Sequence, residues 1–233
     1  MLNINNFSSL GFSRKHFTKI AVRSWLFGLI MLVPISILFL SCGFRLWEPV
    51  PQSLLEPLLV FASALVSASI IGLIEETLFR GLLQSQLTSV MNSLSAIIIV
   101  SIIYSSVHFL QAPDYDLSNG IHWYSGFILL STAFANFSNA GMFLDAWFAL
   151  FLAGIFLSLV RLRTNNILWC IGIHAGWVTH IKVFKDFTDR DNSAECGQFA
   201  SNYDNYVGEF SAIWILFVIC VWALLYFRKS STT

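Results

Sequence analysis

The sequence predicts an all-α protein, a polytopic transmembrane helix bundle with six or seven spans and one re-entrant segment. Hydrophobic residues make up 56% of the 233 residues and charged residues only 11%, whereas a soluble domain carries about 25% charged residues. Long uncharged runs recur along the chain, and a spanning helix needs about 20 such residues. The formal net charge is zero, so no basic field indicates nucleic-acid binding. Without an evident linker, residues 1–233 are expected to form a single membrane-embedded domain.

The first predicted span is residues 24–44, a run of twenty-one residues without a formal charge. The four basic residues before it mark a cytoplasmic side by the positive-inside rule. They are Arg14, Lys15, Lys19 and Arg23. After an interfacial turn at Trp47, Pro57 suits the first turn of a second helix. That helix is expected to continue to about Val90.

Four further helices are predicted from apolar runs, at residues 94–110, 146–160, 165–181 and 210–227. Polar loops are expected at residues 111–119 and 182–209. Residues 121–137 are harder to place, because their strongly apolar part, residues 127–137, is only eleven residues long. That length favours a re-entrant or bundle-buried segment over a simple span.

Lysine and arginine counts favour one of the two topologies slightly. If residues 121–137 do not cross, the cytoplasmic side holds nine basic residues and the outside four; if they cross, the split is eight to five. The positive-inside rule therefore favours six spans plus a partial segment, with both termini in the cytoplasm. Seven spans remain the close alternative.

The ionisable residues of the second helix stand out from this apolar background. Eighteen uncharged residues precede Glu75, and after Glu75, Glu76 and Arg80 another thirty-three residues carry no formal charge. A charged side chain at the centre of a membrane helix costs about 2.5–3.5 kcal/mol on insertion scales, so a cluster of three is a functional-site hypothesis by default. Glu76 and Arg80 are four residues apart and can pair on one helix face.

Two histidines of neighbouring helices are candidates to join this cluster. Glu75 lies sixteen residues before Met91, at the turn, and His108 seventeen residues after it. At 1.5 Å per residue both lie about 25 Å from the turn, which predicts the same depth in the bundle. His174 lies about 15 Å from the start of its own helix by the same rise.

These residues allow two kinds of chemistry. A carboxylate such as Glu75, rotated about 100° away from the Glu76–Arg80 pair on an α-helix, can take a proton from water and return it to a leaving amine. His108 could orient that water, and His174 could donate to a developing oxyanion. Alternatively, Glu75, His108 and His174 form a set of three ligands for a catalytic zinc. Each histidine taken alone also fits a structural role in the bundle.

The four cysteines show no metal-binding spacing. Cys42 and Cys196 could form a disulfide if both face the outside. Cys170 and Cys220 lie in apolar runs, where a cysteine behaves as a small buried hydrophobic residue.

Three short motifs resemble those of the CAAX-protease and bacteriocin-processing (CPBP, or Abi) family of intramembrane proteases. The first is Glu75-Glu76-x-x-x-Arg80, within the text Glu-Glu-Thr-Leu-Phe-Arg-Gly; the second is Tyr104-x-x-x-His108; the third begins at His174. That family includes the type II CAAX prenyl endopeptidase. The resemblance covers a protease-like core of about residues 58–183.

The resemblance implies an intramembrane endopeptidase in which Glu75 and His108 activate water and His174 lines the oxyanion side. The implied partners are a membrane-associated peptide or protein substrate and the lipid bilayer, and zinc is the one cofactor considered. Tyr104 replaces the usual Phe, which keeps the ring. Val178 replaces the usual Asn and cannot donate a hydrogen bond. Either Thr179 or Asn136 substitutes, or this site is weakened.

Val178 keeps a second hypothesis open, a non-catalytic membrane adaptor or bacteriocin-immunity protein with a degenerate site. A proton-coupled transporter ranks third. Its ionisable residues would be spread along a path across the bilayer, whereas here they gather at one level.

Overall fold

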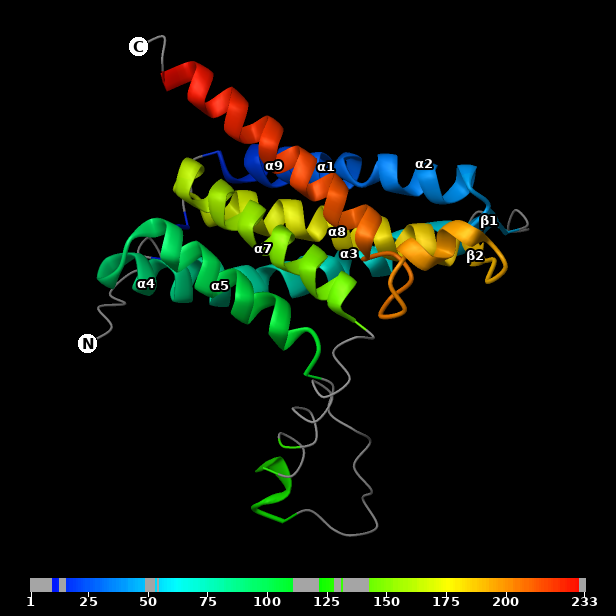
Figure 1. Cartoon of the computed structure of the whole chain (residues 1–233), viewed down its shortest axis with the longest axis horizontal. Coiled ribbons are helices and arrows are strands. Elements are labelled where there is room, and N and C mark those ends of the chain that lie inside the picture. The colour runs from blue at the N-terminus through cyan, green and yellow to red at the C-terminus, as the bar shows by residue number, and fades with distance from the viewer. Residues whose placement is uncertain are drawn as a thin grey trace. The chain divides into compact units, whose positions relative to one another are not determined.

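The computed structural model describes residues 10–12, 16–48, 53, 55–110, 122–127, 131 and 143–230. The chain divides into two compact units. Unit 1 comprises Met1–Val100 and Ile155–Phe199, and unit 2 comprises Ser101–Gly154 and Ala200–Thr233. Helices dominate the described residues (Figure 1), which confirms the predicted all-α class.

Unit 1 contains, in chain order, α1 (Phe17–Met31), α2 (Val33–Ser41), β1 (Arg45–Trp47), α3 (Leu55–Glu76), a π-helical segment (Thr77–Leu83), α4 (Gln84–Val90), α8 (Ile167–Asp186), β2 (Thr188–Arg190) and a 3-10 helix (Glu195–Phe199). Helix α9 (Glu209–Ser230) belongs to unit 2. Helices α5 (Ser93–Val107) and α7 (Leu144–Thr164) each run from one unit into the other.

Four helical stretches among the described residues are long and apolar enough to cross a membrane: Phe17–Ser41, Leu55–Val90, Leu144–Thr164 and Ile167–Asp186. Two shorter apolar helices, Ser93–Val107 and Glu209–Leu224, accompany them. All six coincide with predicted helices, while the number of spans stays a prediction. The predicted loop 111–119 lies outside the described residues, as does segment 121–137 except for residues 122–127 and 131.

The predicted bounds of two segments are wrong. The first helix begins at Phe17 rather than residue 24 and so includes Lys19 and Arg23, because long basic side chains can leave an apolar face while the backbone stays helical. Helix α8 continues to Asp186. The predicted loop 182–209 therefore begins later, and it contains a strand and a 3-10 helix.

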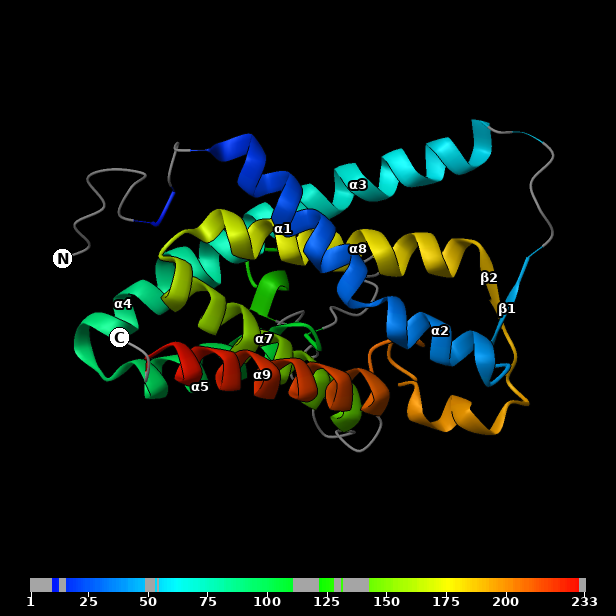
Figure 2. The same cartoon turned by 90° about the horizontal axis from the view of Figure 1, so that it is seen from above.

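Helix α8 is the centre of unit 1, because α1 and α3 both pack against it (Figure 2). Small residues make the approach close. A Cβ on Gly28 would collide with the backbone of Ile173, and one on Gly176 would collide with the carbonyl of Trp25. On the other side, a Cβ on Gly72 would lie 3.1 Å from the carbonyl oxygen of Ile171. Such contacts hold the helix backbones in register without large side chains between them.

Side-chain hydrogen bonds add to the α1–α8 contact. The indole Nε1 of Trp25 donates to the hydroxyl of Thr179 at 3.3 Å, and the hydroxyl of Ser24 lies 3.4 Å from the carbonyl oxygen of Leu168. Helix α1 thus contacts α8 on both sides of His174.

A disulfide and a short two-stranded sheet link the segment after α2 to the segment after α8. Strands β1 and β2 pair antiparallel, and the guanidinium of Arg45 donates to the carbonyl oxygen of Thr188 at 3.0 Å. Cys42 and Cys196 form a disulfide, which confirms that predicted pairing. Among the described residues, Cys170 is buried as predicted, whereas Cys220 is exposed.

Candidate active site

The first part of the site lies where α3 passes into the π-helical segment. The buried face of α3 is the stripe Ala64, Ala68, Gly72 and Glu76, spaced four residues apart. This spacing places the Glu76 side chain against the bundle, where it is 0% exposed, and leaves Glu75 28% exposed.

The predicted Glu76–Arg80 pair is present. The Arg80 Nη1 donates to the Glu76 Oε1 at 3.0 Å, and both side chains are fully buried. A buried guanidinium and carboxylate lower each other's desolvation cost only when they are paired in this way.

Helix α8 brings His174 to the same carboxylate. The His174 Nδ1 lies 2.8 Å from the Glu76 Oε1, and its Nε2 lies 3.9 Å from the Glu75 Oε2. Because a carboxylate paired with Arg80 only accepts, the ring donates from Nδ1. The other nitrogen, Nε2, therefore faces Glu75, so Arg80, Glu76 and His174 form one hydrogen-bonded chain that orients the imidazole.

The π-helical segment is the part of the site that the sequence did not predict. It spans Thr77–Leu83, begins directly after the two carboxylates and contains Arg80. Short π-helical turns inside α-helices are frequent at functional sites. Within it, a Cβ on Gly81 would lie 2.9 Å from the Cδ1 of Ile167, so glycine admits the start of α8. Beyond it, the amide of Gln84 donates to the Ser158 carbonyl oxygen at 3.1 Å.

His108 belongs to unit 2, directly after α5. Its Nδ1 lies 2.7 Å from the carbonyl oxygen of Tyr104, and the two rings meet edge to face with centroids 4.7 Å apart. The four-residue spacing of the motif thus orients the histidine through the backbone of the preceding turn. Because Nδ1 donates to that carbonyl, the lone pair of a neutral ring lies on Nε2. The approach of His108 to Glu75 stays a prediction.

Thr179 does not have the role expected of it as a hydrogen-bond donor to the oxyanion. Its hydroxyl is fully buried, donates to the carbonyl oxygen of Ala175 at 2.7 Å and accepts the Trp25 indole N–H. The single hydroxyl hydrogen is therefore used within the bundle, and Thr179 does not substitute for the donor missing at Val178. Asn136, the other suggested donor, lies outside the described residues.

The predicted zinc ligands can be tested in part. Glu75 and His174 present one oxygen and one nitrogen 3.9 Å apart, and a carboxylate behind the histidine is typical of zinc sites. A catalytic zinc needs a third protein ligand. Among the residues that the structure describes, no group of three or more His, Cys, Asp or Glu side chains could hold a metal ion. Unit 1 thus contains two of the three predicted ligands, Glu75 and His174, and the zinc site stays a prediction.

One model of a known protein family matches part of the chain. The family model described as "Type II CAAX prenyl endopeptidase Rce1-like" matches residues 57–180, which is more than half of the chain. The matched segment contains all five predicted site residues. Comparisons with curated proteins and with solved structures return no match.

Proposed function

The chain belongs to the Rce1-like family of type II CAAX prenyl endopeptidases, and from that premise we propose that Glu75 activates a water to hydrolyse a peptide bond of a membrane-associated substrate. Membership makes the protein an intramembrane protease of the CAAX type, with a peptide or protein substrate. The four long apolar helices accord with an integral membrane protein.

One observation carries the proposal: the hydrogen-bonded chain from Arg80 through Glu76 turns the Nε2 of His174 toward Glu75. A separation of 3.9 Å is too long for a direct hydrogen bond but short enough for one water to contact both groups. Glu75 is partly exposed while Glu76 is not. Glu75 is thus the more exposed of the two carboxylates, although its Oε2, the oxygen nearest His174, is itself buried.

The proposed reaction follows from these positions. Glu75 takes a proton from the water, whose oxygen attacks the carbonyl carbon of the scissile bond. The carbon–nitrogen bond then breaks, and Glu75 returns the proton to the leaving amine. His108, with its lone pair on Nε2, helps to orient the water.

His174 has a role that depends on its protonation. Because Nδ1 donates to Glu76, the Nε2 can donate to a developing oxyanion only when the ring carries both protons. A neutral ring accepts a hydrogen bond from the water instead. Glu76 and Arg80 are positioning residues, because they act through His174.

The test uses the full chain, purified in detergent and returned to lipid vesicles, with a fluorogenic peptide that carries a membrane anchor. Glu75→Gln keeps the shape of the side chain and removes the base, so we expect kcat to fall by about 10²–10⁴-fold. His108→Ala and His174→Ala are expected to abolish cleavage as well. Each variant is checked for insertion and thermal unfolding. Full activity of Glu75→Gln would refute the mechanism.

Val178 favours a second candidate, a non-catalytic membrane adaptor or bacteriocin-immunity protein. It follows His174 by one helical turn and offers no donor. Val178→Asn separates the two candidates: in an active enzyme that lacks a donor, the added amide is expected to raise kcat, by up to about 10²-fold. A wild-type protein and a Val178→Asn variant that both lack turnover on anchored peptides would favour the adaptor.

The proposal includes an orientation, with both termini at the cytoplasmic face. Lys19 and Arg23 lie in the first two turns of α1, and the Cys42–Cys196 disulfide lies beyond the end of α2. Disulfides persist in oxidising compartments, which supports placing that end outside the cytoplasm.

A further inference from the structure

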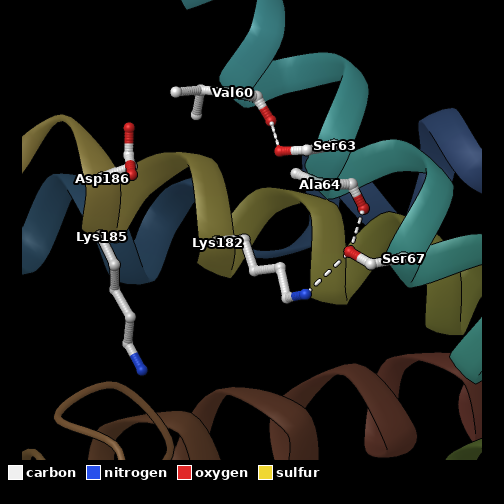
Figure 3. A pocket seen from close by; sticks show the side chains of 7 residues that line it. All are labelled: Val60, Ser63, Ala64, Ser67, Lys182, Lys185 and Asp186. Carbon is white, nitrogen blue, oxygen red and sulfur yellow. Dashed lines mark hydrogen bonds between the residues drawn. The ribbon is translucent and has the colours of Figure 1, made fainter.

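The chain that follows His174 contributes to both units. In unit 1, the Lys182 Nζ donates to the hydroxyl oxygen of Ser67 at 2.7 Å, beside a cavity of about 560 Å³ between α3 and α8 (Figure 3). That contact joins two helices of unit 1. In unit 2, the loop of residues 200–208 connects the 3-10 helix to α9, and this loop contacts a predicted catalytic residue.

Tyr203 of this loop reaches the backbone of His108. The phenolic hydroxyl of Tyr203 donates to the His108 carbonyl oxygen at 3.0 Å. The Tyr203 ring also packs on Phe109, with the ring centroids 4.6 Å apart. Phe109 in turn stacks on Phe143, with the centroids 4.5 Å apart. Tyr203 thus holds the predicted catalytic histidine by a hydrogen bond and the next residue by aromatic packing.

The place of His108 in the chain explains why its carbonyl needs this donor. Helix α5 ends at Val107, and the last carbonyl groups of a helix have no partner within the helix itself. The carbonyl oxygens of the two residues before His108 accept from backbone amides three residues further on. His108 follows the last helical residue, so the hydrogen bonds of α5 do not fix its backbone, and the Tyr203 hydroxyl does.

Two hydrogen bonds therefore hold His108, one on its ring and one on its main chain. The ring Nδ1 bonds to the carbonyl oxygen of Tyr104, within α5. The main-chain carbonyl accepts from Tyr203, outside α5. The first bond sets the rotation of the imidazole, and the second sets the backbone that carries it. Both matter for catalysis, because the rate falls steeply when a catalytic group is displaced.

The loop is itself supported, so Tyr203 reaches His108 from a defined position. The Ser201 hydroxyl donates to the Asp145 Oδ1 at 3.1 Å and accepts the backbone amide of Tyr203 at 3.1 Å. Asp204 accepts the backbone amides two and three residues further on, at 3.0 and 2.7 Å. These bonds tie the loop to the first turn of α7 and fold it back on itself.

We propose that Tyr203 is a positioning residue for His108, and that its hydroxyl fixes the backbone from which the imidazole orients the attacking water. This inference rests on the proposed function, because it takes His108 as the group that orients the water. Tyr203 lies outside residues 57–180, the segment that matches the family. The loop before α9 thus completes the active site, a role that its polar composition did not indicate.

The test compares Tyr203→Phe with Tyr206→Phe in the full chain, returned to lipid vesicles with the anchored fluorogenic peptide. Tyr203→Phe keeps the ring that packs on Phe109 and removes only the hydroxyl. We expect kcat to fall by about 3–10-fold with KM unchanged, because one neutral hydrogen bond is lost. Tyr206→Phe removes a hydroxyl from the same loop without touching His108, and it is expected to keep the wild-type kcat.

A second measurement separates positioning from stability. Isotope-labelled histidine gives ring signals for the five histidines in nuclear magnetic resonance, and the His108 signal is assigned by its loss in His108→Ala. Tyr203→Phe should shift this signal and leave that of His174 unchanged, whereas Tyr206→Phe should shift neither. Thermal unfolding of both variants is measured in parallel, because a purely structural role predicts lower stability with the His108 signal unmoved.

Three results would overturn the role of Tyr203. One is a wild-type kcat in Tyr203→Phe. Another is an equal loss of kcat and thermal stability in Tyr203→Phe and Tyr206→Phe, as a general role of the loop in folding predicts. The third is a loss of kcat without any shift of the His108 signal. If Glu75→Gln matches the wild type, the proposed function itself fails, and the His108 signal still decides whether Tyr203 positions the histidine.

Discussion

Replacing Glu76 by glutamine tests the buried hydrogen-bonded chain of Arg80, Glu76 and His174, with little change in the shape of the side chain. The same oxygen of Glu76, Oε1, accepts from both Arg80 and His174. The amide oxygen of a glutamine can occupy that position and accept both hydrogen bonds. The substitution therefore removes the negative charge while it keeps the geometry, and Arg80 loses the carboxylate that balances its own charge.

The expected loss of stability follows from the burial of the Glu76–Arg80 pair. Both side chains are 0% exposed, so solvent does not screen the remaining guanidinium. Removing one partner of a buried ion pair costs about 3–5 kcal/mol, whereas removing both partners is often neutral. Glu76→Gln should therefore lower the free energy of unfolding by about 3–5 kcal/mol, and Glu76→Gln with Arg80→Met should recover most of the loss.

The assay is a double-mutant cycle on the detergent-solubilised protein. Unfolding is measured for the wild type, the two single variants and the double variant, and cleavage of an anchored peptide is measured in parallel. The double variant should recover stability but not activity, because its His174 still lacks the carboxylate partner. We expect the double variant to remain about 10–100-fold less active than the wild type, the loss typical when the carboxylate partner of a metal-binding histidine is removed.

Two results would refute this reasoning. A Glu76→Gln variant within about 1 kcal/mol of the wild type would mean that Arg80 does not depend on the charge, since exposed pairs contribute no more than that. A double variant less stable than either single variant would mean that the two side chains act independently.

Three further predictions concern packing, the disulfide and metal. Gly176→Val should lower the free energy of unfolding by about 1–3 kcal/mol, because the valine side chain would collide with Trp25. Gly126→Ala is the control, because a Cβ there meets no atom within 4 Å. Equal stability of the two variants would contradict the packing argument. Cys42→Ser should cost about 2–5 kcal/mol, measured by thermal unfolding against Cys220→Ser, and no difference would show that the disulfide does not stabilise unit 1. Activity should persist within about twofold in 1,10-phenanthroline if the water is activated by Glu75 alone, whereas a loss that added zinc reverses would establish the metal-dependent alternative.

The positions of the helices could be predicted because long uncharged runs are typical of spanning helices and rare elsewhere. Their ends could not be predicted as well. Lys19 and Arg23 interrupt the apolar run before the first span, yet the backbone stays helical through both. The charge of Lys182 predicts the start of a loop, although α8 continues to Asp186. Charge marks where an apolar surface ends, and the helical hydrogen bonds can continue beyond that point.

The site could be predicted where one helix carries both partners. The four-residue spacing of Glu76 and Arg80 is sufficient to predict their pairing. The contact between His174 and Glu76 could not be predicted, because depth along α8 does not determine how that helix is rotated. The π-helical segment had no signal in the residue pattern, since it differs from an α-helix in hydrogen bonding and not in composition.

Helix α1 lies outside the segment that matches the family, residues 57–180, yet its backbone touches α8 at Gly28 and Trp25. Gly172 and Gly176 flank His174 on the surface that α1 covers. A truncated chain limited to the matched residues would remove α1, expose that glycine surface to lipid and leave His174 without the helix that packs beside it. The segment that matches the family is therefore shorter than the part of the chain that is needed to hold His174 in place. An experiment on a shortened chain should retain the residues from Phe17 onward.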